Sequence, residues 1–416
     1  MTVSINRILG GVLLVTGTCI GAGMLALPVS SAAAGFYPSL GAFIFCWIMM
    51  MISAFFMLEV SLWYPQETNL ITMARETLGK GGEIIAWGTY VLFLYALLTA
   101  YTAGATGIIA KFLAYLGYQE KASIWVLVSI FATIVFLGAK WVDWANRLLI
   151  IGLAGGYMML VSNVVPEVSH DLLTVNAPKF IWTTIPLLVT SFGFHLLIPS
   201  LRNYLKGDSR ALRIAIFIGS TLPLIIYLLW EMLVLGVIPV EGEQGLVAMQ
   251  YAERFEGKQA VIELTQLLSH ILHNQKITFF ARLFGLCAIL TSFIGVALGL
   301  FDFFSDGFQI KKSIMGKLGL SLMTFLPPTL LVLYYPSFMM ALHYAGFFAV
   351  ILLVIFPAMM VWSGRYRLGQ NSGYQVIGGK ALVLFSLLFG LGVIGLEVME
   401  RMGKLPTPLA NQHLFE

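Results

Sequence analysis

The residues best suited to bind a ligand lie in two apolar stretches that glycine and proline interrupt. The first stretch, residues 17–28, reads GTCIGAGMLALP, and the second, residues 190–199, reads TSFGFHLLIP. Each glycine weakens a helix by about 1 kcal/mol, and an internal proline removes one backbone hydrogen bond. We therefore expect both helices to unwind near the middle of their spans, where freed peptide groups can bind a ligand.

Free peptide groups of both polarities match a zwitterion. N–H groups at the start of a half-helix bind a carboxylate, and carbonyls at the end of a half-helix bind an ammonium group. Glycines let the ligand approach the backbone closely. The sequence thus predicts a free amino acid as the ligand. We expect its carboxylate at the N–H groups of Ala22, Gly23 and Met24, its ammonium at carbonyls around Thr18, Cys19, Ser191 and Phe192, and close approach at Gly21 and Gly193.

Four polar side chains in the apolar segments are further candidates. His195 lies inside the second stretch, where it either reads the ligand side chain and handles a coupled proton or only satisfies unwound backbone. Tyr101, about midway along another apolar segment, is expected to hydrogen-bond the ligand carboxylate. Thr291 and Ser292 lie together in an apolar run. They either complete a cation site with carbonyls of the first stretch or bond back to their own helix.

The composition indicates that the elements carrying these residues lie in a lipid bilayer. Of the 416 residues, 24 are Lys or Arg and 20 are Asp or Glu, so 11% are charged, against roughly 25% in soluble domains. Such a composition excludes a soluble globular chain and a disordered one. The sequence has no basic cluster suited to nucleic acid and no motif for a nucleophile, a metal or a phosphate loop. We expect a membrane protein that is not an enzyme and holds no cofactor.

Eleven apolar segments are long enough to span a membrane as helices. They lie near 8–34, 38–64, 84–116, 122–140, 147–166, 180–203, 213–238, 279–304, 317–335, 337–362 and 378–399. The first five and the next five form two sets that each begin with an interrupted segment and contain a longer polar loop, 65–83 or 239–278. Because five is an odd number of spans, the second set begins on the opposite side of the membrane and is inverted relative to the first. Paired interruptions in inverted halves indicate a secondary transporter.

The expected units are therefore two repeats and one additional helix. The first repeat covers residues 1–166, the inverted repeat covers 167–363 with its long outer loop, and residues 364–416 form the eleventh helix and a tail. The densest Lys and Arg clusters, at 202–213 and 311–317, lie on one side of the membrane. The positive-inside rule then places the N-terminus in the cytoplasm and, with eleven spans, the C-terminus in the periplasm.

Several stretches resemble the bacterial hydroxy and aromatic amino acid permeases of the amino acid/polyamine/organocation superfamily. The two interrupted stretches are similar to the first- and sixth-helix motifs of that family. Two later stretches, TSFIGVALGLFD at 291–302 and FLPP at 325–328, are similar to its eighth- and ninth-helix sequences. The resemblance covers nearly the whole chain and is strongest to the tyrosine-specific members. One departure is Cys19, where relatives usually carry threonine.

The resemblance implies a LeuT-like fold of five plus five inverted helices, with an eleventh helix, in the bacterial inner membrane. It also implies that the broken helices hold an aromatic amino acid, taken up together with protons. Tryptophan permeases share the sixth-helix motif, so tyrosine, tryptophan and phenylalanine stay open, as does the oligomeric state. Two alternatives remain, a sodium-coupled symporter that uses Thr291 and Ser292, and a receptor that binds an amino acid without moving it.

Overall fold

The computed structural model describes residues 4–21, 23–66, 68–114, 120–242, 245–250, 264, 267–268, 275–371 and 373–406, and these are almost entirely helical. Within this part of the chain, nine helices are long and apolar enough to cross a membrane. A tenth span results if the bent pair α1 and α2 is one span, and the helix Ala122–Leu137 is apolar but shorter. The prediction of a helical protein with many membrane spans is confirmed.

Each of the eleven predicted segments contains helix. Their bounds are α1 (Ile5–Cys19) and α2 (Gly23–Ser31), α3 (Phe36–Trp63), α4 (Leu70–Ala114), α5 (Glu120–Leu137), α6 (Ala139–Val164), α8 (Ile185–Ser191) and α9 (Ile198–Tyr204), α10 (Ser209–Leu235), α13 (Gln275–Gly307), α14 (Ile314–Tyr334), α15 (Phe338–Ala349) and α16 (Phe356–Tyr366), and α17 (Gly379–Arg401). A short helix, α7 (His170–Leu173), follows α6. Most of the predicted outer loop 239–278 lies outside the described residues.

The third segment begins earlier than the sequence predicts. α4 starts at Leu70, within the stretch 65–83 that we expected to be a polar loop, and that prediction is wrong here. Leu70, Met73 and Ala74 are buried because one face of this amphipathic piece packs on the core. The helix changes direction at Gly79, whose φ of 77° is readily adopted only by glycine.

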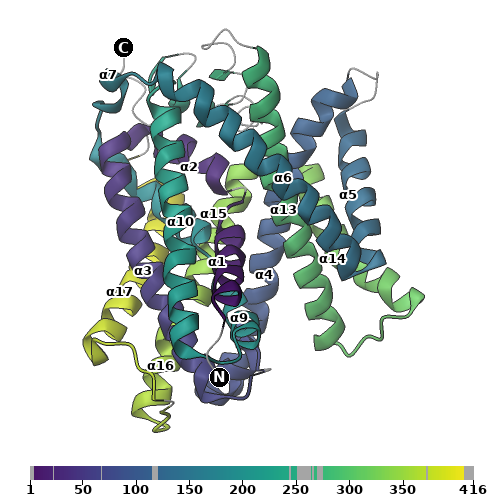
Figure 1. The fold of residues 1–416 in the computed structure, drawn as a ribbon, viewed down its shortest axis with the longest axis vertical. Helices are drawn as coiled ribbons and strands as arrows, with labels where there is room; N and C mark the ends of the chain where they lie inside the picture. The colour runs from purple at the N-terminus through teal and green to yellow at the C-terminus, as the bar shows by residue number, and fades with distance from the viewer. Residues whose placement is uncertain are drawn as a thin grey trace.

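Both interrupted spans pack against several other helices of the bundle. α10 packs along α1 and against α3, α13 packs along α6, and α15 packs along α4 and α8. Figure 1 shows α10 beside α1, with α3 and α17 on one side of the view and α5 and α14 on the other. In the span that contains α8 and α9, 61% of the apolar window is buried, compared with 17% in α6. The second predicted ligand-binding stretch is thus enclosed by other helices, whereas in the first stretch Cys19 is buried and Gly17 and Thr18 are exposed. α6 exposes apolar side chains to the surroundings.

Candidate functional site

The first interruption separates α1 from α2 at the glycines that predicted it. α1 ends at Cys19, α2 begins at Gly23, and the two helices are bent by 52°. The Met24 N–H, one expected carboxylate donor, donates to the Gly21 carbonyl at 3.1 Å in this conformation. Ala22, another expected donor, lies outside the described residues.

The second interruption separates α8 from α9. α8 ends at Ser191, a short 3₁₀ turn follows, and α9 begins at Ile198. The Gly193 N–H donates to the Thr190 carbonyl at 3.0 Å, and a Cβ on this glycine would lie 2.8 Å from the same oxygen. A side chain at position 193 would therefore collide with the backbone, which explains why glycine is present there. The fully buried Phe192 caps the helix end.

A tyrosine of α10 joins the two interruptions. The Tyr227 hydroxyl lies 2.5 Å from the Cys19 carbonyl oxygen and 3.1 Å from the Ser191 carbonyl oxygen. Because a hydroxyl has one hydrogen, it can donate to only one of these oxygens at a time. A Cβ on Gly23 would lie 2.6 Å from the Ser191 Oγ, so α2 and α8 also touch directly. Two carbonyls that we expected to bind an ammonium group therefore converge on one point.

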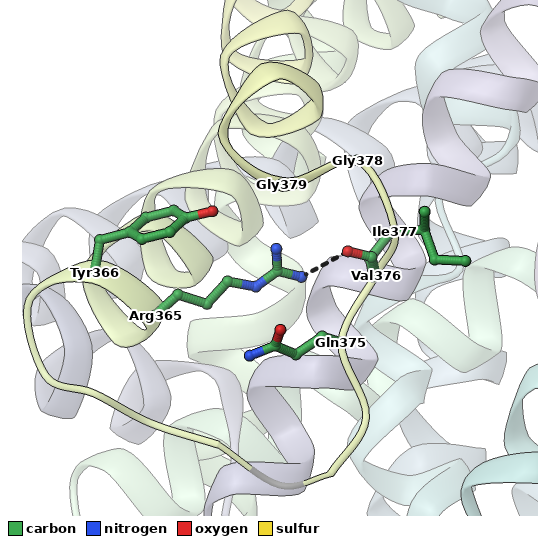
Figure 2. Close-up of a pocket in the computed structure, with 7 residues that line it drawn as sticks. All are labelled: Arg365, Tyr366, Gln375, Val376, Ile377, Gly378 and Gly379. Carbon is green, nitrogen blue, oxygen red and sulfur yellow. Dashed lines mark hydrogen bonds between the residues drawn. The ribbon is translucent and has the colours of Figure 1, made fainter.

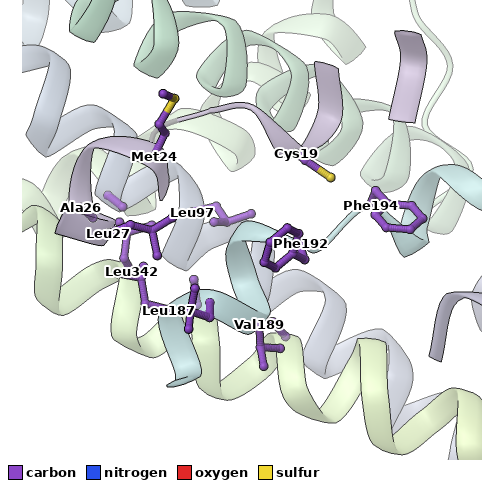
Figure 3. Close-up of a cluster of buried hydrophobic side chains, with 14 of the residues drawn as sticks. Cys19, Met24, Ala26, Leu27, Leu97, Leu187, Val189, Phe192, Phe194 and Leu342 are labelled. Carbon is purple, nitrogen blue, oxygen red and sulfur yellow. The ribbon is translucent and has the colours of Figure 1, made fainter. Parts of the chain in front are cut away.

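The converging carbonyls lie within an apolar core. Figure 3 shows Phe192 and Met24 among buried side chains from α2, α4, α8 and α15. The Phe192 ring is edge-on to the Tyr227 ring at 5.4 Å. Hydrogen bonds are stronger in such low-dielectric surroundings, and a buried polar group left without a partner is correspondingly costly. A polar ligand bound here would have to satisfy the carbonyls that Tyr227 now satisfies.

The structure brings Tyr101 and Ser292 next to the first interruption. A Cβ on Gly21 would lie 2.1 Å from the Ser292 Oγ, and the Tyr101 side chain faces Ser292 from α4. The hydroxyls of Thr291 and Ser292 lie 3.0 and 3.3 Å from the Ala288 carbonyl oxygen, so both bond back to their own helix. Ser292 is thus positioned at the break, while its hydroxyl is engaged within α13.

Two predicted site residues, His195 and Thr18, form no hydrogen bond or ring contact at the place where the Cys19 and Ser191 carbonyls converge, among the residues that the structure describes. His195 is fully buried, with its ring 5.2 Å from the Phe194 ring and facing the backbone of Met50 in α3. Neither ring nitrogen has a hydrogen-bond partner among the described residues. Thr18 is exposed, and its hydroxyl donates to the Leu14 carbonyl at 2.8 Å. Their predicted roles stay predictions.

Sequence reasoning missed Tyr227. Tyr227 and Glu231 are polar residues one turn apart in the otherwise apolar second half of α10, residues 222–235, so they share one face of the helix. That spacing is the only signal in the sequence, since the carbonyls that Tyr227 reaches belong to segments far away in the chain. Both side chains are buried, at 1% and 0% exposure.

A second polar cluster lies where α3 and α16 meet. Glu59 of α3 is fully buried and accepts hydrogen bonds from Arg365 Nε at 2.6 Å, from Arg365 Nη2 and from the Val376 N–H at 2.8 Å. From α9, Arg202 donates to the Ser61 carbonyl near the end of α3. We call Glu59, Arg365 and Val376 the lock, because they tie three separate segments together.

A cavity of about 430 Å³ lies beside the lock, in the loop between α16 and α17. Figure 2 shows Arg365 pointing into this loop, with Nη2 donating to the Val376 carbonyl at 3.1 Å. In the same loop, burial raises the pKa of Tyr374 to about 12, so its phenol stays neutral beside the Arg213 guanidinium, 5.2 Å from the ring. The cavity belongs to the loop and is separate from the helix interruptions.

A third cluster has the donor types of a metal site. One ligand atom each of His343, Glu397 and Glu400 lies within 4.8 Å of the others. Arg401 donates to Glu397 at 2.9 Å, so an arginine already supplies the positive charge there.

Comparisons with known proteins agree with the resemblance seen in the sequence. The profile of the tryptophan/tyrosine permease family matches residues 4–397. Among the relatives, a tyrosine-specific transport system 1 of Haemophilus influenzae is 33% identical, over 96% of this chain and 99% of its own. A tryptophan-specific transport protein of the same organism is also 33% identical, over 95% of this chain and 96% of its own.

A solved structure supports the fold alone. A manganese transporter of Eremococcus coleocola, crystallised with an aromatic bis-isothiourea compound, is similar to this chain with a TM-score of 0.65. The similarity covers 97% of this chain and 89% of the transporter, at 11% sequence identity.

Proposed function

Because this chain belongs to the tryptophan/tyrosine permease family, we propose that it imports an aromatic amino acid, tyrosine in particular, by proton symport and alternating access. The chain is a permease and not an enzyme. The observation that carries the proposal is the convergence of the Cys19 and Ser191 carbonyls at the meeting point of the two interrupted helices.

The proposed architecture is the LeuT-like arrangement of two inverted five-helix repeats. Residues 1–166 form the first repeat, 167–363 the second and 364–416 the additional helix. Its support is the pair of interruptions at matching places, α1 to α2 and α8 to α9. Interrupted helices in corresponding positions are where secondary transporters bind substrates. We assign the protein to the bacterial inner membrane with a cytoplasmic N-terminus and a periplasmic C-terminus, on the basis of the positive-inside rule.

The substrate would use the peptide groups of both interruptions. The ammonium group replaces the Tyr227 hydroxyl at the Cys19 and Ser191 carbonyls, a place already suited to one donor. The carboxylate binds at the start of α2, where freeing the Met24 N–H from the Gly21 carbonyl adds a donor. Glycines 21, 23 and 193 permit this close approach, and Tyr101 completes the carboxylate site. The aromatic side chain then packs against Phe192, with His195 beyond it.

Sodium coupling is the alternative that has its own supporting observation. Ser292 lies against Gly21, so one hydroxyl is already next to the end of α1, and Thr291 adjoins it. A cation there would bind the two hydroxyl oxygens through their lone pairs, while the hydroxyl hydrogens still donate to the Ala288 carbonyl. Uptake of labelled tyrosine at fixed pH, with sodium replaced by choline, separates the two ions. Proton symport predicts unchanged uptake, and loss of uptake would favour sodium.

The test of the proposed substrate is counterflow in proteoliposomes. Vesicles loaded with unlabelled tyrosine should transiently concentrate labelled tyrosine from outside, whereas a receptor that does not transport would show only slow equilibration. Competition by each of the twenty amino acids then gives the specificity. We expect tyrosine, tryptophan and phenylalanine to compete and aliphatic or charged amino acids to compete weakly. Equal competition by all of them would overturn the aromatic assignment.

A further inference from the structure

Glu231 of α10 is a buried carboxyl group with an incomplete set of partners. Its side chain is fully buried. The Ser31 hydroxyl of α2 is hydrogen-bonded to Oε1, and Oε2 has no hydrogen-bond partner among the described residues. A buried polar atom without a partner needs an explanation. An ionisable side chain inside a membrane span is, in addition, more often functional than structural.

No cation among the described residues pairs with Glu231. The other titratable groups on α10 and on the elements packed against it are Arg210, Arg213 and Tyr227 on α10, Arg7 and Cys19 on α1, Tyr37, Cys46 and Glu59 on α3, Lys140, Asp143, Arg147 and Tyr157 on α6, and His170 and Asp171 on α7, with none on α2. None of them forms an ion pair with Glu231 within the described part of the chain. In the residue ranges that the structure describes, no fixed positive charge therefore holds the carboxyl group in its ionised form.

The contact with Ser31 accommodates both protonation states of Glu231. The Ser31 hydroxyl has two oxygens in reach, Glu231 Oε1 and, at 2.8 Å, the Leu27 carbonyl. When Glu231 is ionised, Ser31 donates its single hydrogen to Oε1. When Glu231 is protonated, the acid can donate to the Ser31 oxygen, and Ser31 then donates to the Leu27 carbonyl. Rotation of one hydroxyl hydrogen is enough to pass between the two arrangements.

Glu231 is also connected to the substrate-binding region. It lies one turn from Tyr227 on the same face of α10, and Tyr227 contacts the ends of both α1 and α8. Through Ser31, Glu231 contacts the far end of α2, the second half of the first interrupted span. A change of protonation at Glu231 thus alters the bond between α10 and a helix that must move during alternating access.

We infer that Glu231 is the residue that takes up and releases the coupled proton, an assignment that rests on the proposed function. On the outer side the carboxylate binds one proton from water, the neutral acid is carried through the conformational change with the substrate, and the same proton leaves to the inner side. No other bond forms or breaks. By linkage, proton and substrate must each bind more tightly when the other is present.

The assay measures two kinds of transport in proteoliposomes for wild type, Glu231→Gln, Glu231→Asp and the control Glu241→Gln. Glu241 is an exposed glutamate shortly after the end of α10. The first measurement is counterflow of labelled tyrosine at equal pH, with tryptophan and phenylalanine run in parallel. The second measurement is accumulation of labelled tyrosine when the interior pH is one unit above the exterior pH. With one proton per substrate, the ratio of interior to exterior tyrosine then reaches at most about tenfold.

Glu231→Gln should keep counterflow within about threefold of wild type and lose accumulation driven by the pH gradient. The neutral amide imitates the protonated acid but cannot release a proton. Glu231→Asp should retain part of the accumulation because it still titrates, and Glu241→Gln should match wild type. Tyrosine binding in detergent should weaken with rising pH in wild type and become independent of pH in Glu231→Gln.

Normal accumulation by Glu231→Gln would overturn the assignment. Equal loss of counterflow and accumulation in both Glu231 variants would also overturn it, because Glu231 would then be structural. Failure of the proposed function appears in wild type instead. Counterflow without a response to the pH gradient would exclude proton symport, and with it this role of Glu231. Counterflow with another aromatic amino acid would change the substrate and leave the test of Glu231 in place.

Discussion

Two buried glutamates of this protein have opposite surroundings. Glu59 and Glu231 are both fully buried. In the lock, Glu59 accepts two hydrogen bonds from the guanidinium of Arg365 and one from the Val376 N–H. Among the residues that the structure describes, the partner of Glu231 is the Ser31 hydroxyl alone. Burial alone does not distinguish the two residues, whereas their partners do.

The difference indicates a division of roles between the two regions. A carboxylate paired with a buried guanidinium keeps its charge, and loss of either partner leaves an uncompensated charge. The lock therefore suits a fixed connection between α3 and α16. A carboxyl group with one neutral partner can change its protonation at smaller cost. Variants in the lock should chiefly change stability, and variants around α10 should chiefly change transport.

The largest expected effect on stability is that of Glu59→Gln. The variant leaves the guanidinium of Arg365, whose side chain is 5% exposed, without its counter-charge, which costs about 3–5 kcal/mol. We expect a clearly lower midpoint of thermal unfolding in detergent. Asp143→Asn is the matched control, since it breaks an exposed ion pair of 2.9 Å with Arg147 and should leave the midpoint unchanged. An unchanged midpoint for Glu59→Gln would contradict the assignment of the lock.

A smaller effect is expected for Gly21→Ala at the first interruption. The new methyl group would lie 2.1 Å from the Ser292 Oγ, so the serine must move, and overpacking of this kind costs about 1–3 kcal/mol. Counterflow should slow markedly. Gly17→Ala is the control, because nothing lies within 4 Å of its methyl position. The double variant with Ser292→Ala should recover part of the counterflow, and similar rates for both glycine variants would refute the contact.

Tyr227→Phe should have a modest effect on stability. It removes a hydroxyl that bonds the Cys19 or Ser191 carbonyl, and one such bond contributes about 1 kcal/mol. Since the hydroxyl competes with the ammonium group for these carbonyls, tyrosine should bind with equal or higher affinity. Isothermal titration in detergent measures this affinity. Affinity about tenfold weaker would show that Tyr227 instead helps to bind the substrate.

The smallest effect on stability is expected for Glu231→Gln. The amide keeps the shape of the side chain and leaves no cation of the described chain unpaired, so the free energy of unfolding should change by less than about 1 kcal/mol. The unfolding midpoint in detergent, compared directly with that of Glu59→Gln, measures the contrast between the two glutamates. Equal destabilisation by the two substitutions would remove the distinction between the regions.

The sequence predicts the existence of the helices better than their starts. Runs of apolar residues predicted the helices that are long enough to cross a membrane within the described residues, and the glycines predicted both interruptions. The start of α4 was missed because Arg75 and Glu76 make residues 65–83 resemble a loop. Packing of Met73 and Ala74 on the core favours helix there nevertheless. A hydropathy average depends only on composition, whereas the start of α4 depends on which side chains of the helix face the rest of the bundle.

The candidate site was predictable where it consists of backbone, and two side chains beside it, Tyr101 and Ser292, were also named in advance. Glycine and proline mark the chain positions of freed peptide groups, so Cys19 and Ser191 could be named in advance. A single tyrosine in an apolar helix has no such local signal. Tyr227 matters because tertiary packing brings its hydroxyl to carbonyls at the ends of α1 and α8, both more than 30 residues away in sequence. His195, which its residue type and position singled out, faces the backbone of Met50 in α3, and its predicted role stays a prediction.

The most direct test records proton entry during tyrosine uptake. Wild-type protein is reconstituted in vesicles that contain a pH-sensitive dye, and tyrosine is added outside with no pH gradient imposed. We expect the interior to acidify as tyrosine enters, with no acidification after addition of glycine and none in Glu231→Gln vesicles. Entry of labelled tyrosine without any acidification in wild type would contradict proton symport, and acidification equal to wild type in Glu231→Gln would contradict the role of Glu231.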